Sequence, residues 1–168
     1  GKTAPTVKDS EYFVSAFNTI QELIEKDLIL AGHDISAGGM ITALLEMNFG
    51  NPEGGLEINL DKIAEKDIIK ILFSENPGVL IQVKDKNSVE KILQNNGIGF
   101  SKIGRPCKER HILVKKDNAE YQFGIDYLRD VWFSSSYLLD RKQSSLKKLP
   151  PVRIMMNFRS IPLFIPIW

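Results

Sequence analysis

The sequence predicts an α/β or α+β fold, in which a mixed sheet of about four to six strands is covered by helices. Three observations support this fold class. Short apolar runs alternate along the chain with segments whose apolar residues recur at helical spacing. Clusters of Gly, Pro, Asn and Ser separate these segments and are typical of turns. The 168 residues, 43% hydrophobic and 26% charged, suit one soluble domain with a real core, or one domain with a tail.

The first predicted elements are a helix over residues 10–27 and a short strand at residues 28–31. Asp9 or Ser10 is expected to cap the helix, because either side chain accepts hydrogen bonds from the free backbone N–H groups of the first turn. One apolar stripe of the helix is expected to face the core: Tyr12, Phe13, Ala16, Phe17, Ile20, Leu23 and Ile24.

A second helix is predicted from about Ala37 to the Asn-Phe-Gly that ends at Gly50. Gly50 is expected to supply the left-handed residue that commonly terminates a helix. Alternation of apolar and polar residues predicts a half-buried strand at residues 56–60. Residues 61–73, which are rich in Ile and Lys, predict one or two short helical turns.

The middle of the chain predicts a strand, a helix and a second strand. Residues 79–83 form the clearest strand of the sequence. The helix is predicted over about residues 88–94, with Asn87 as its cap and Glu90 placed for a capping box. The second strand is predicted at residues 98–103 and is closed by a Gly-Arg-Pro turn.

The last part of the folded region predicts a β-hairpin and a helix. Apolar runs at residues 111–114 and 121–123 flank a polar turn, which is the pattern of a hairpin. The helix is predicted over about residues 126–140, with one face formed by Leu128, Val131, Trp132, Ser135 and Leu139.

Charge and cysteine content exclude several classes of function. The formal net charge of +1 gives no electrostatic argument for a nucleic-acid or membrane partner. The single cysteine, Cys107, excludes an internal disulfide and leaves no cysteine cluster for zinc, which suits a reducing cytosol. No apolar signal region or bilayer-spanning run is present. We therefore expect a cytoplasmic protein without nucleic-acid or membrane partners.

The strongest functional pattern is the His-Asp-Ile-Ser-Ala-Gly-Gly stretch at residues 33–39. It is predicted as a polar, glycine-rich turn between a strand and a helix start, where free N–H groups and the helix dipole favour a phosphate. Asp34 adds a carboxylate that suits Mg²⁺, and Ser36 adds a hydroxyl that would cap the helix or meet a phosphate oxygen. Together with Gly38 and Gly39, these residues form a candidate nucleotide–magnesium site.

Simpler interpretations remain for each of these residues. Asp34 and Ser36 can be a turn carboxylate and a helix cap that touch no ligand. The paired glycines can serve close packing, although glycine in a helix costs about 1 kcal/mol relative to alanine. His33 fits a packing or supporting role better than acid–base catalysis. Glu75 either lies near a site or caps a turn.

Several motifs resemble the C-terminal α/β domain of the aminoimidazole ribonucleotide synthetase superfamily. The His-Asp-x-Ser-x-Gly-Gly signature is followed in order by motifs at residues 55–58, 72–75, 78–83 and 103–105. Residues 44–49, and residues 130–132 through 136–137, are most similar to the phosphoribosylformylglycinamidine synthase family. The resemblance covers roughly residues 1–143.

The resemblance implies part of an ATP-dependent ligase of purine biosynthesis. In that family ATP phosphorylates the amide oxygen of formylglycinamide ribonucleotide, and ammonia from glutamine displaces the phosphate. By resemblance, Asp34 is a Mg²⁺ ligand, Ser36, Gly38 and Gly39 contact ATP or ADP, and the catalytic residues are unknown. The implied partners are a preceding synthetase domain, a glutaminase domain and the small-molecule nucleotide substrate.

The sequence departs from the family pattern in three respects. The preceding synthetase domain is absent, no glutaminase domain is recognisable, and Ala37 stands where relatives usually carry an aspartate that would support a metal. We therefore expect one domain of a larger enzyme, inactive by itself. The alternatives are a non-catalytic nucleotide-holding or interaction module of the same polypeptide, or another superfamily member acting on thiamine phosphate, selenide or hydrogenase maturation.

The sequence divides into a domain over residues 1–141 and a tail over residues 142–168. From Arg141 onward the chain has six basic residues and no acidic one, whereas the preceding part is mildly acidic. Prolines argue against a helix in the tail. An altered reading frame or an artificial end would explain this composition, and an apolar arm that docks on a partner is the alternative.

Overall fold

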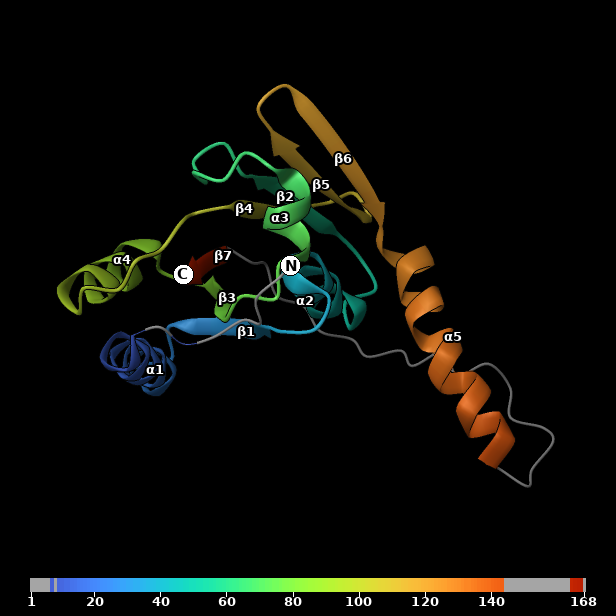
Figure 1. Ribbon diagram of the computed structural model, residues 1–168, viewed down its shortest axis with the longest axis horizontal. Coiled ribbons are helices and arrows are strands. Elements are labelled where there is room, and N and C mark those ends of the chain that lie inside the picture. Colours follow the sequence, from blue (N-terminus) through green and yellow to red (C-terminus); the bar gives the residue numbers. More distant parts are fainter. Residues whose placement is uncertain (1–6, 8, 144–163, 168) are drawn as a thin grey trace.

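The computed structural model describes residues 7, 9–143 and 164–167, and it has helices packed on a mixed sheet (Figure 1). The predicted fold class is confirmed. The elements in chain order are α1 (Ser10–Glu25), β1 (Ile29–Ile35), α2 (Gly39–Phe49), β2 (Gly55–Asn59), α3 (Ile68–Phe73), β3 (Gly78–Val83), α4 (Lys86–Asn95), β4 (Gly104–Cys107), β5 (His111–Lys116), β6 (Ala119–Gly124), α5 (Ile125–Gln143) and β7 (Phe164–Ile167).

The strands form one sheet in the order β1-β3-β7-β4-β2-β5-β6. All neighbouring strands are antiparallel except β2 and β5, which run parallel. Six of the strands come from the region where four to six were predicted. The seventh, β7, comes from the tail, for which no element was predicted, and it lies between β3 and β4.

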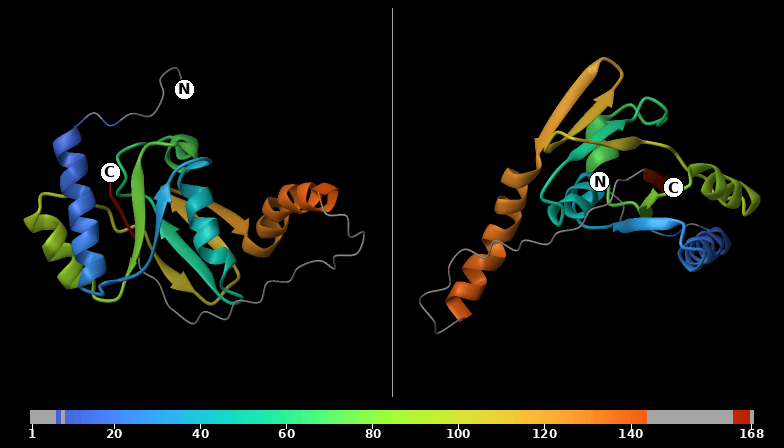
Figure 2. Two further views of the ribbon diagram at one scale, coloured as in Figure 1. Left: turned by 90° about the horizontal axis from the view of Figure 1, so that it is seen from below. Right: turned by 180° about the vertical axis from the view of Figure 1, so that it is seen from behind.

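Two buried clusters cover opposite faces of this sheet, because successive residues of a strand point to opposite sides. On one face Leu80 packs with Ile35 of β1 and Leu44 of α2. On the other face Ile81 packs with Leu23 of α1 and Leu93 of α4. Figure 2 shows α1 and α4 side by side at one end of the sheet and α5 extending away from the body.

The start of α1 is capped as predicted, but its apolar stripe is only partly buried. The Asp9 carboxylate accepts the backbone N–H of Tyr12 at 2.9 Å. Leu23 is buried, whereas Phe17 is 56% exposed and Phe13 and Ile24 are also exposed. The prediction that the whole stripe faces the core was wrong for these three, because only one narrow side of α1 meets the sheet and α4.

Two helix ends differ from the predictions. Gly50 has φ −77° and ψ −14°, so it is not left-handed; the Asn51 N–H instead donates to Asn48 and continues a right-handed turn. Helix α4 begins earlier than predicted and is capped by Asp85, whose carboxylate accepts the N–H groups of Asn87 and Ser88. Asn87 is therefore not the cap.

The capping box predicted for α4 is also absent from the described structure. The Glu90 carboxylate instead forms an ion pair with the Lys102 ammonium at 2.9 Å. The early cap at Asp85 moves the first turn, so Glu90 lies too far along the helix to reach back to the helix start.

The strand predicted at residues 98–103 lies instead at residues 104–107. Gly104 pairs with Ile58, and a Cβ at Gly104 would come within 2.6 Å of the Glu57 carbonyl oxygen. The glycine that suggested a stop therefore permits a close strand pair. The predicted hairpin is confirmed as β5 and β6, with Asp117 at φ 52° in its turn. No helix in the described part of the chain is long and apolar enough to cross a membrane.

Candidate functional site

The candidate motif lies at one edge of the sheet, where β1 leads into α2. The structure extends β1 through Ile35, so His33 and Asp34 belong to the strand and only residues 36–38 form the turn. The predicted turn at residues 33–39 was too long. Because alternate residues of this strand are exposed, the polar residues His33 and Asp34 can belong to the strand although in the sequence they resemble part of the turn.

The strand register places the two side chains on opposite faces of the sheet. His33 pairs with Leu80, which belongs to the cluster beneath α2, and Asp34 pairs with Val79, which packs with the cluster of α1 and α4. The Asp34 side chain is 73% exposed. Since β1 is an edge strand, this carboxylate is open to a ligand or to another domain.

The turn itself is built by backbone contacts and two glycines. Gly38 is the N-cap of α2 at φ 82°, and Gly39 follows at φ 74°. The Gly39 N–H donates to the Ser36 carbonyl at 3.0 Å, and no side chain caps the helix. The N-cap is Gly38, so of the two roles considered for the Ser36 hydroxyl the helix cap is not formed, and the contact of this exposed side chain with a phosphate stays a prediction.

Close packing explains the glycine at position 39. A Cβ there would come within 2.6 Å of the Leu72 carbonyl oxygen and 2.8 Å of the Phe73 Cα, at the end of α3. The left-handed backbone also favours glycine. Gly39 thus serves the contact between α2 and α3, as the simpler interpretation of the paired glycines held.

Glu75 lies at the start of α2. Its carboxylate accepts the Gly38 N–H at 2.9 Å from the loop that connects α3 to β3. The amides of Gly38 and Gly39 therefore both have acceptors within the chain. A phosphate that binds the Gly38 amide has to displace the Glu75 carboxylate.

His33 connects the motif to α2 through Glu46, a partner that the sequence analysis missed. The Nε2 atom lies 3.1 Å from a Glu46 carboxylate oxygen, and Nδ1 lies 2.7 Å from the Asp34 carbonyl oxygen. Nδ1 is also 3.6 Å from the Asp34 carboxylate. Helical spacing places Glu46 on the same side of α2 as the apolar residues that cover β1, and this was the signal that could have identified it.

The donor set of the motif fits magnesium only as part of a larger site. Mg²⁺ prefers one or two carboxylates together with phosphate oxygens and waters, and Asp34 offers one exposed carboxylate. Among the described residues, no group of three or more His, Cys, Asp or Glu side chains is placed to hold a metal. The remaining ligands would come from the nucleotide or from another domain.

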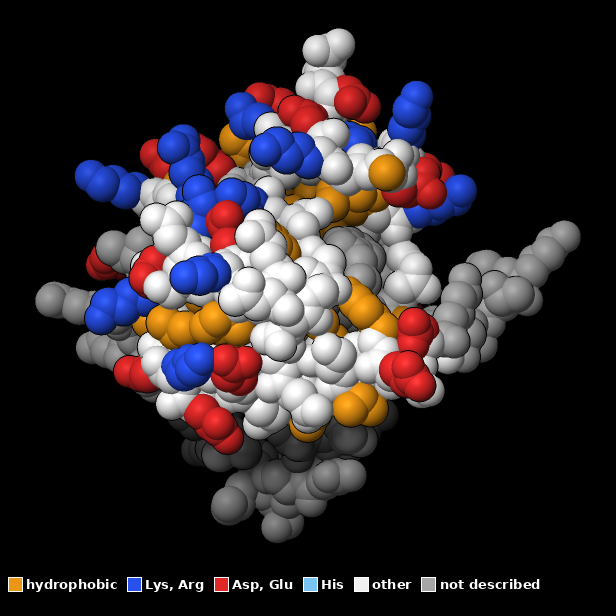
Figure 3. Space-filling model, turned by 90° about the vertical axis from the view of Figure 1, so that its left-hand side faces the viewer, with side chains coloured by type: hydrophobic (Ala, Val, Ile, Leu, Met, Phe, Trp, Pro, Cys, Tyr) orange, Lys and Arg blue, Asp and Glu red, His pale blue; other side chains and the backbone are white. Residues whose placement is uncertain are grey.

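A groove lies away from the motif, along α1. An open groove of about 590 Å³ is lined by Ser10, Glu11, Val14, Ser15, Asn18, Thr19, Glu22 and Asn96. Figure 3 shows the side of the molecule that carries α1 and α4, where hydrophobic side chains surface between acidic and basic ones. The groove contains none of the motif residues, so concavity alone does not identify the motif as the site.

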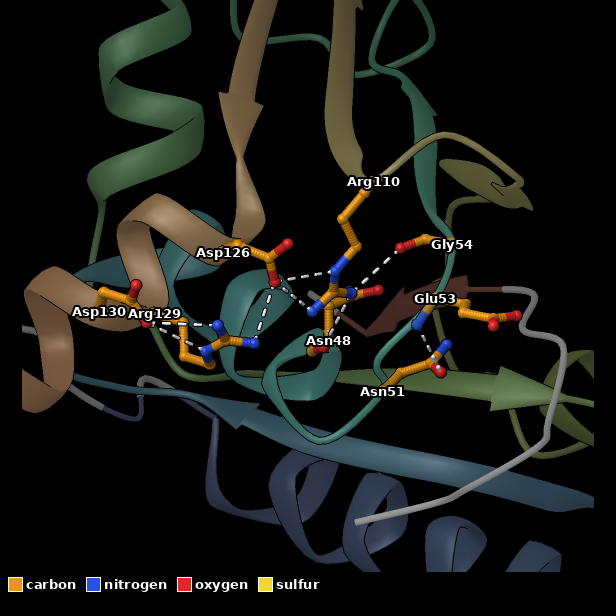
Figure 4. A network of polar contacts seen from close by, with 8 residues as sticks. All are labelled: Asn48, Asn51, Glu53, Gly54, Arg110, Asp126, Arg129 and Asp130. Atoms are coloured by element: carbon orange, nitrogen blue, oxygen red, sulfur yellow. Dashed lines mark hydrogen bonds and ion pairs between the residues drawn. The ribbon is translucent and has the colours of Figure 1, made fainter. Parts of the chain in front are cut away.

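A second polar network fixes the other end of α2 (Figure 4). The Arg110 guanidinium donates to the Asn48 carbonyl at 3.3 Å, to the Gly54 carbonyl at 3.1 Å and to the Asp126 carboxylate at 3.1 Å. Arg129 donates to the same carboxylate at 2.9 Å. Arg110, which the sequence analysis did not single out, thereby joins α2, the loop before β2 and the start of α5.

Cys107 lacks the environment of a nucleophile. Burial raises the pKa of its thiol above the ordinary value, which disfavours the reactive thiolate. Its Sγ lies 3.5 Å from the Glu109 carbonyl oxygen, so the thiol donates a weak hydrogen bond there.

The fold and the motif define an α/β domain of the aminoimidazole ribonucleotide (AIR) synthase type. The family model described as AIR synthase related protein, C-terminal domain, matches residues 2–116, and the chain belongs to this family. The resemblance inferred from the sequence is thus confirmed.

Within this family, the chain is similar to several proteins with the same name. The chain is 30% identical, over 96% of its length, to the probable phosphoribosylformylglycinamidine synthase, chloroplastic/mitochondrial, of Arabidopsis thaliana, and 29% identical, over 86%, to the human phosphoribosylformylglycinamidine synthase. It spans only 12% and 11% of those two proteins. Structures of Thermotoga maritima PurL complexed with ATP or with FGAR have TM-scores of 0.59 and 0.60 to this fold. Both are 19% identical and cover 68% of this chain, which spans 21% and 20% of theirs.

Proposed function

We propose that this chain is the C-terminal α/β domain of a synthetase region in a phosphoribosylformylglycinamidine synthase, and that it contributes to a magnesium–nucleotide site. The observation that carries the proposal is the family match over residues 2–116, which includes the exposed Asp34 and Ser36 at the sheet edge. The whole enzyme would be an ATP-dependent carbon–nitrogen ligase that takes its amide nitrogen from glutamine and acts on formylglycinamide ribonucleotide.

Three residues of the motif, Asp34, Ser36 and Gly38, contact the ligand in this proposal. Asp34 supplies a carboxylate to Mg²⁺, and the Ser36 hydroxyl donates to a phosphate oxygen. The positive end of the α2 dipole favours the phosphate charge. The Gly38 N–H joins the phosphate contacts once Glu75 has moved away. When bound, Mg²⁺ would neutralise phosphate charge.

A non-catalytic, nucleotide-holding role is the second candidate, and one observation favours it. Both ring nitrogens of His33, the histidine of the motif, contact acceptors within the chain. His33 is thus engaged in structure rather than free for proton transfer. The names of the relatives favour phosphoribosylformylglycinamidine synthase over superfamily members that act on thiamine phosphate, selenide or hydrogenase maturation.

The short span of the match supports the proposal of partner domains, without identifying them. The chain covers about an eighth of its Arabidopsis relative, and in this proposal a preceding synthetase domain and a glutaminase domain complete the reaction. A cytoplasmic location and the lack of nucleic-acid or membrane partners stay predictions from composition.

Titration calorimetry of ADP with and without Mg²⁺ tests the site. We expect magnesium-dependent binding that Asp34→Asn removes, because a carbonyl oxygen is a weaker Mg²⁺ ligand than a carboxylate. Asp61→Asn is the matched control, since the Asp61 carboxylate accepts hydrogen bonds from the Asn59 amide and the Asp117 N–H, away from the motif. Equal binding by the wild type and Asp34→Asn would exclude Asp34 as a ligand. Complementation of a truncated synthase by this chain separates the catalytic role from the holding role.

A further inference from the structure

The His33 ring contacts acceptors at both of its nitrogens, and this restricts where its protons can be. The Asp34 carbonyl oxygen, 2.7 Å from Nδ1, can only accept a hydrogen bond, so Nδ1 carries a proton. The carboxylate of Glu46 lies 3.1 Å from Nε2. The ring thus links the main chain at Asp34 to the Glu46 side chain of α2.

The contact between His33 and Glu46 is half-buried and joins two elements of the fold. The side chains of His33 and Glu46 are 29% and 26% exposed, so both are half-buried where they meet. One partner lies near the end of β1 and the other near the end of α2, on either side of the turn at residues 36–38. The charged groups within ion-pair distance of the ring are the carboxylates of Glu46 and Asp34.

We propose that His33 and Glu46 form a clamp that positions the β1–α2 turn, by bonding the backbone carbonyl of Asp34 to α2. The clamp holds the main chain at Asp34, whose exposed carboxylate lies 3.6 Å from Nδ1 of the same ring. His33 is thus a positioning residue: it sets the direction of the proposed metal ligand without itself binding nucleotide. Only the last readout below rests on the proposed function.

The first readout is the tautomer of His33, measured from the ring ¹⁵N chemical shifts of the intact chain. The chain contains one other histidine, and His111→Asn assigns the signals. We expect a proton on Nδ1 of His33 in the wild type, although free histidine prefers its proton on Nε2. A neutral ring with bare Nδ1 would overturn the clamp, and this result requires no variant to fold.

The second readout compares two substitutions of the same residue. In Glu46→Gln the amide N–H donates to Nε2, so a neutral Nδ1–H ring keeps both contacts. In Glu46→Leu the Nε2 contact is lost. We expect hydrogen exchange of residues 34–38 to rise about tenfold in Glu46→Leu and to stay within about twofold of the wild type in Glu46→Gln. Glu22→Leu, which removes a surface ion pair with Lys26 on α1, is the matched control and should leave this exchange unchanged.

Equal exchange in Glu46→Leu and Glu46→Gln would also overturn the clamp. The third readout is the affinity for ADP with Mg²⁺, which should fall about tenfold in Glu46→Leu and return in Glu46→Gln. If the wild type binds no ADP, the proposed function fails, whereas the ring shifts and the exchange rates still decide the clamp. If ADP binds equally well to both Glu46 variants, the positioning role fails and the nucleotide site stands.

Discussion

At the scale of single residues, the motif combines groups that hold the turn with groups left open. Gly39 and Glu75 make the turn compact, through a close approach to α3 and a hydrogen bond to Gly38. The side chains of Asp34 and Ser36 are exposed, and both residues support the turn through their backbone carbonyls. This division of roles is the reason to place ligand contacts on Asp34 and Ser36 and structural contacts on Gly39.

Gly39→Ala should destabilise the protein more than Gly97→Ala. Both glycines have positive φ, so each substitution costs about 1 kcal/mol for the left-handed backbone. At Gly97 a Cβ meets nothing within 4 Å, whereas at Gly39 it meets the backbone of α3. We expect an additional loss of at least about 1 kcal/mol for Gly39→Ala, measured by urea unfolding. Equal losses would contradict the close approach.

The Asp85 cap should make the stability depend on pH. The hydroxyl and N–H of Ser88, with the N–H of Asn87, lower the pKa of Asp85 below its ordinary value of 3.8. A carboxylate with a lowered pKa in the folded state contributes stability above the pKa of the unfolded chain and loses it as the pH falls through the folded pKa. The melting temperature should therefore fall less steeply below about pH 4 in Asp85→Asn than in the wild type. Parallel curves would exclude this linkage.

At the scale of elements, sequence patterns predicted which segments are helices and strands better than where they begin. The hairpin and the helices follow from apolar periodicity. The ends of α4 and β4 were misplaced, because Asp85 competes with Asn87 as a cap and Gly104 permits close pairing instead of stopping a strand. The pairing of Gly104 with Ile58 depends on a segment distant in sequence, which periodicity does not contain, whereas the cap of α4 is a choice between two nearby residues.

Arg110 is expected to be the main polar link between α2 and α5. Arg110→Ala should lower the free energy of unfolding by about 2–3 kcal/mol, because its side chain is only 18% exposed, two backbone carbonyls lose a donor and the Asp126 carboxylate keeps only Arg129. Arg105→Ala is the matched control. Arg105 pairs with Glu57 but is 74% exposed, so we expect a loss below about 1 kcal/mol. Denaturant unfolding measures both, and a similar loss in the two variants would contradict the link.

At the scale of the whole molecule, the exposed apolar surface of α1 and the short span of the match both support the proposal that this chain is one domain of a larger enzyme. Phe13, Phe17 and Ile24 remain exposed on α1, although their spacing predicts a core-facing stripe. The chain matches only 12% of its Arabidopsis relative. Sequence patterns could identify the family and the motif, but they could not separate surface that faces the core from surface left uncovered here.

The magnesium–nucleotide site was predictable from the sequence only in part. The family motif led to Asp34 and Ser36, whereas the strand register that puts Asp34 and His33 on opposite faces required the fold. The partners of Gly38 and His33, which are Glu75 and Glu46, also required the fold because no local pattern links them.

The central claim is that a metal–nucleotide complex binds at the β1–α2 turn, and paramagnetic broadening by Mn²⁺ with ADP tests it most directly. Mn²⁺ replaces Mg²⁺ at oxygen ligands and broadens the amide signals of nearby residues. We predict selective broadening of residues 34–38 that disappears in Asp34→Asn. Broadening centred on the α1 groove around Asn18 and Asn96, or none at residues 34–38, would contradict the claim.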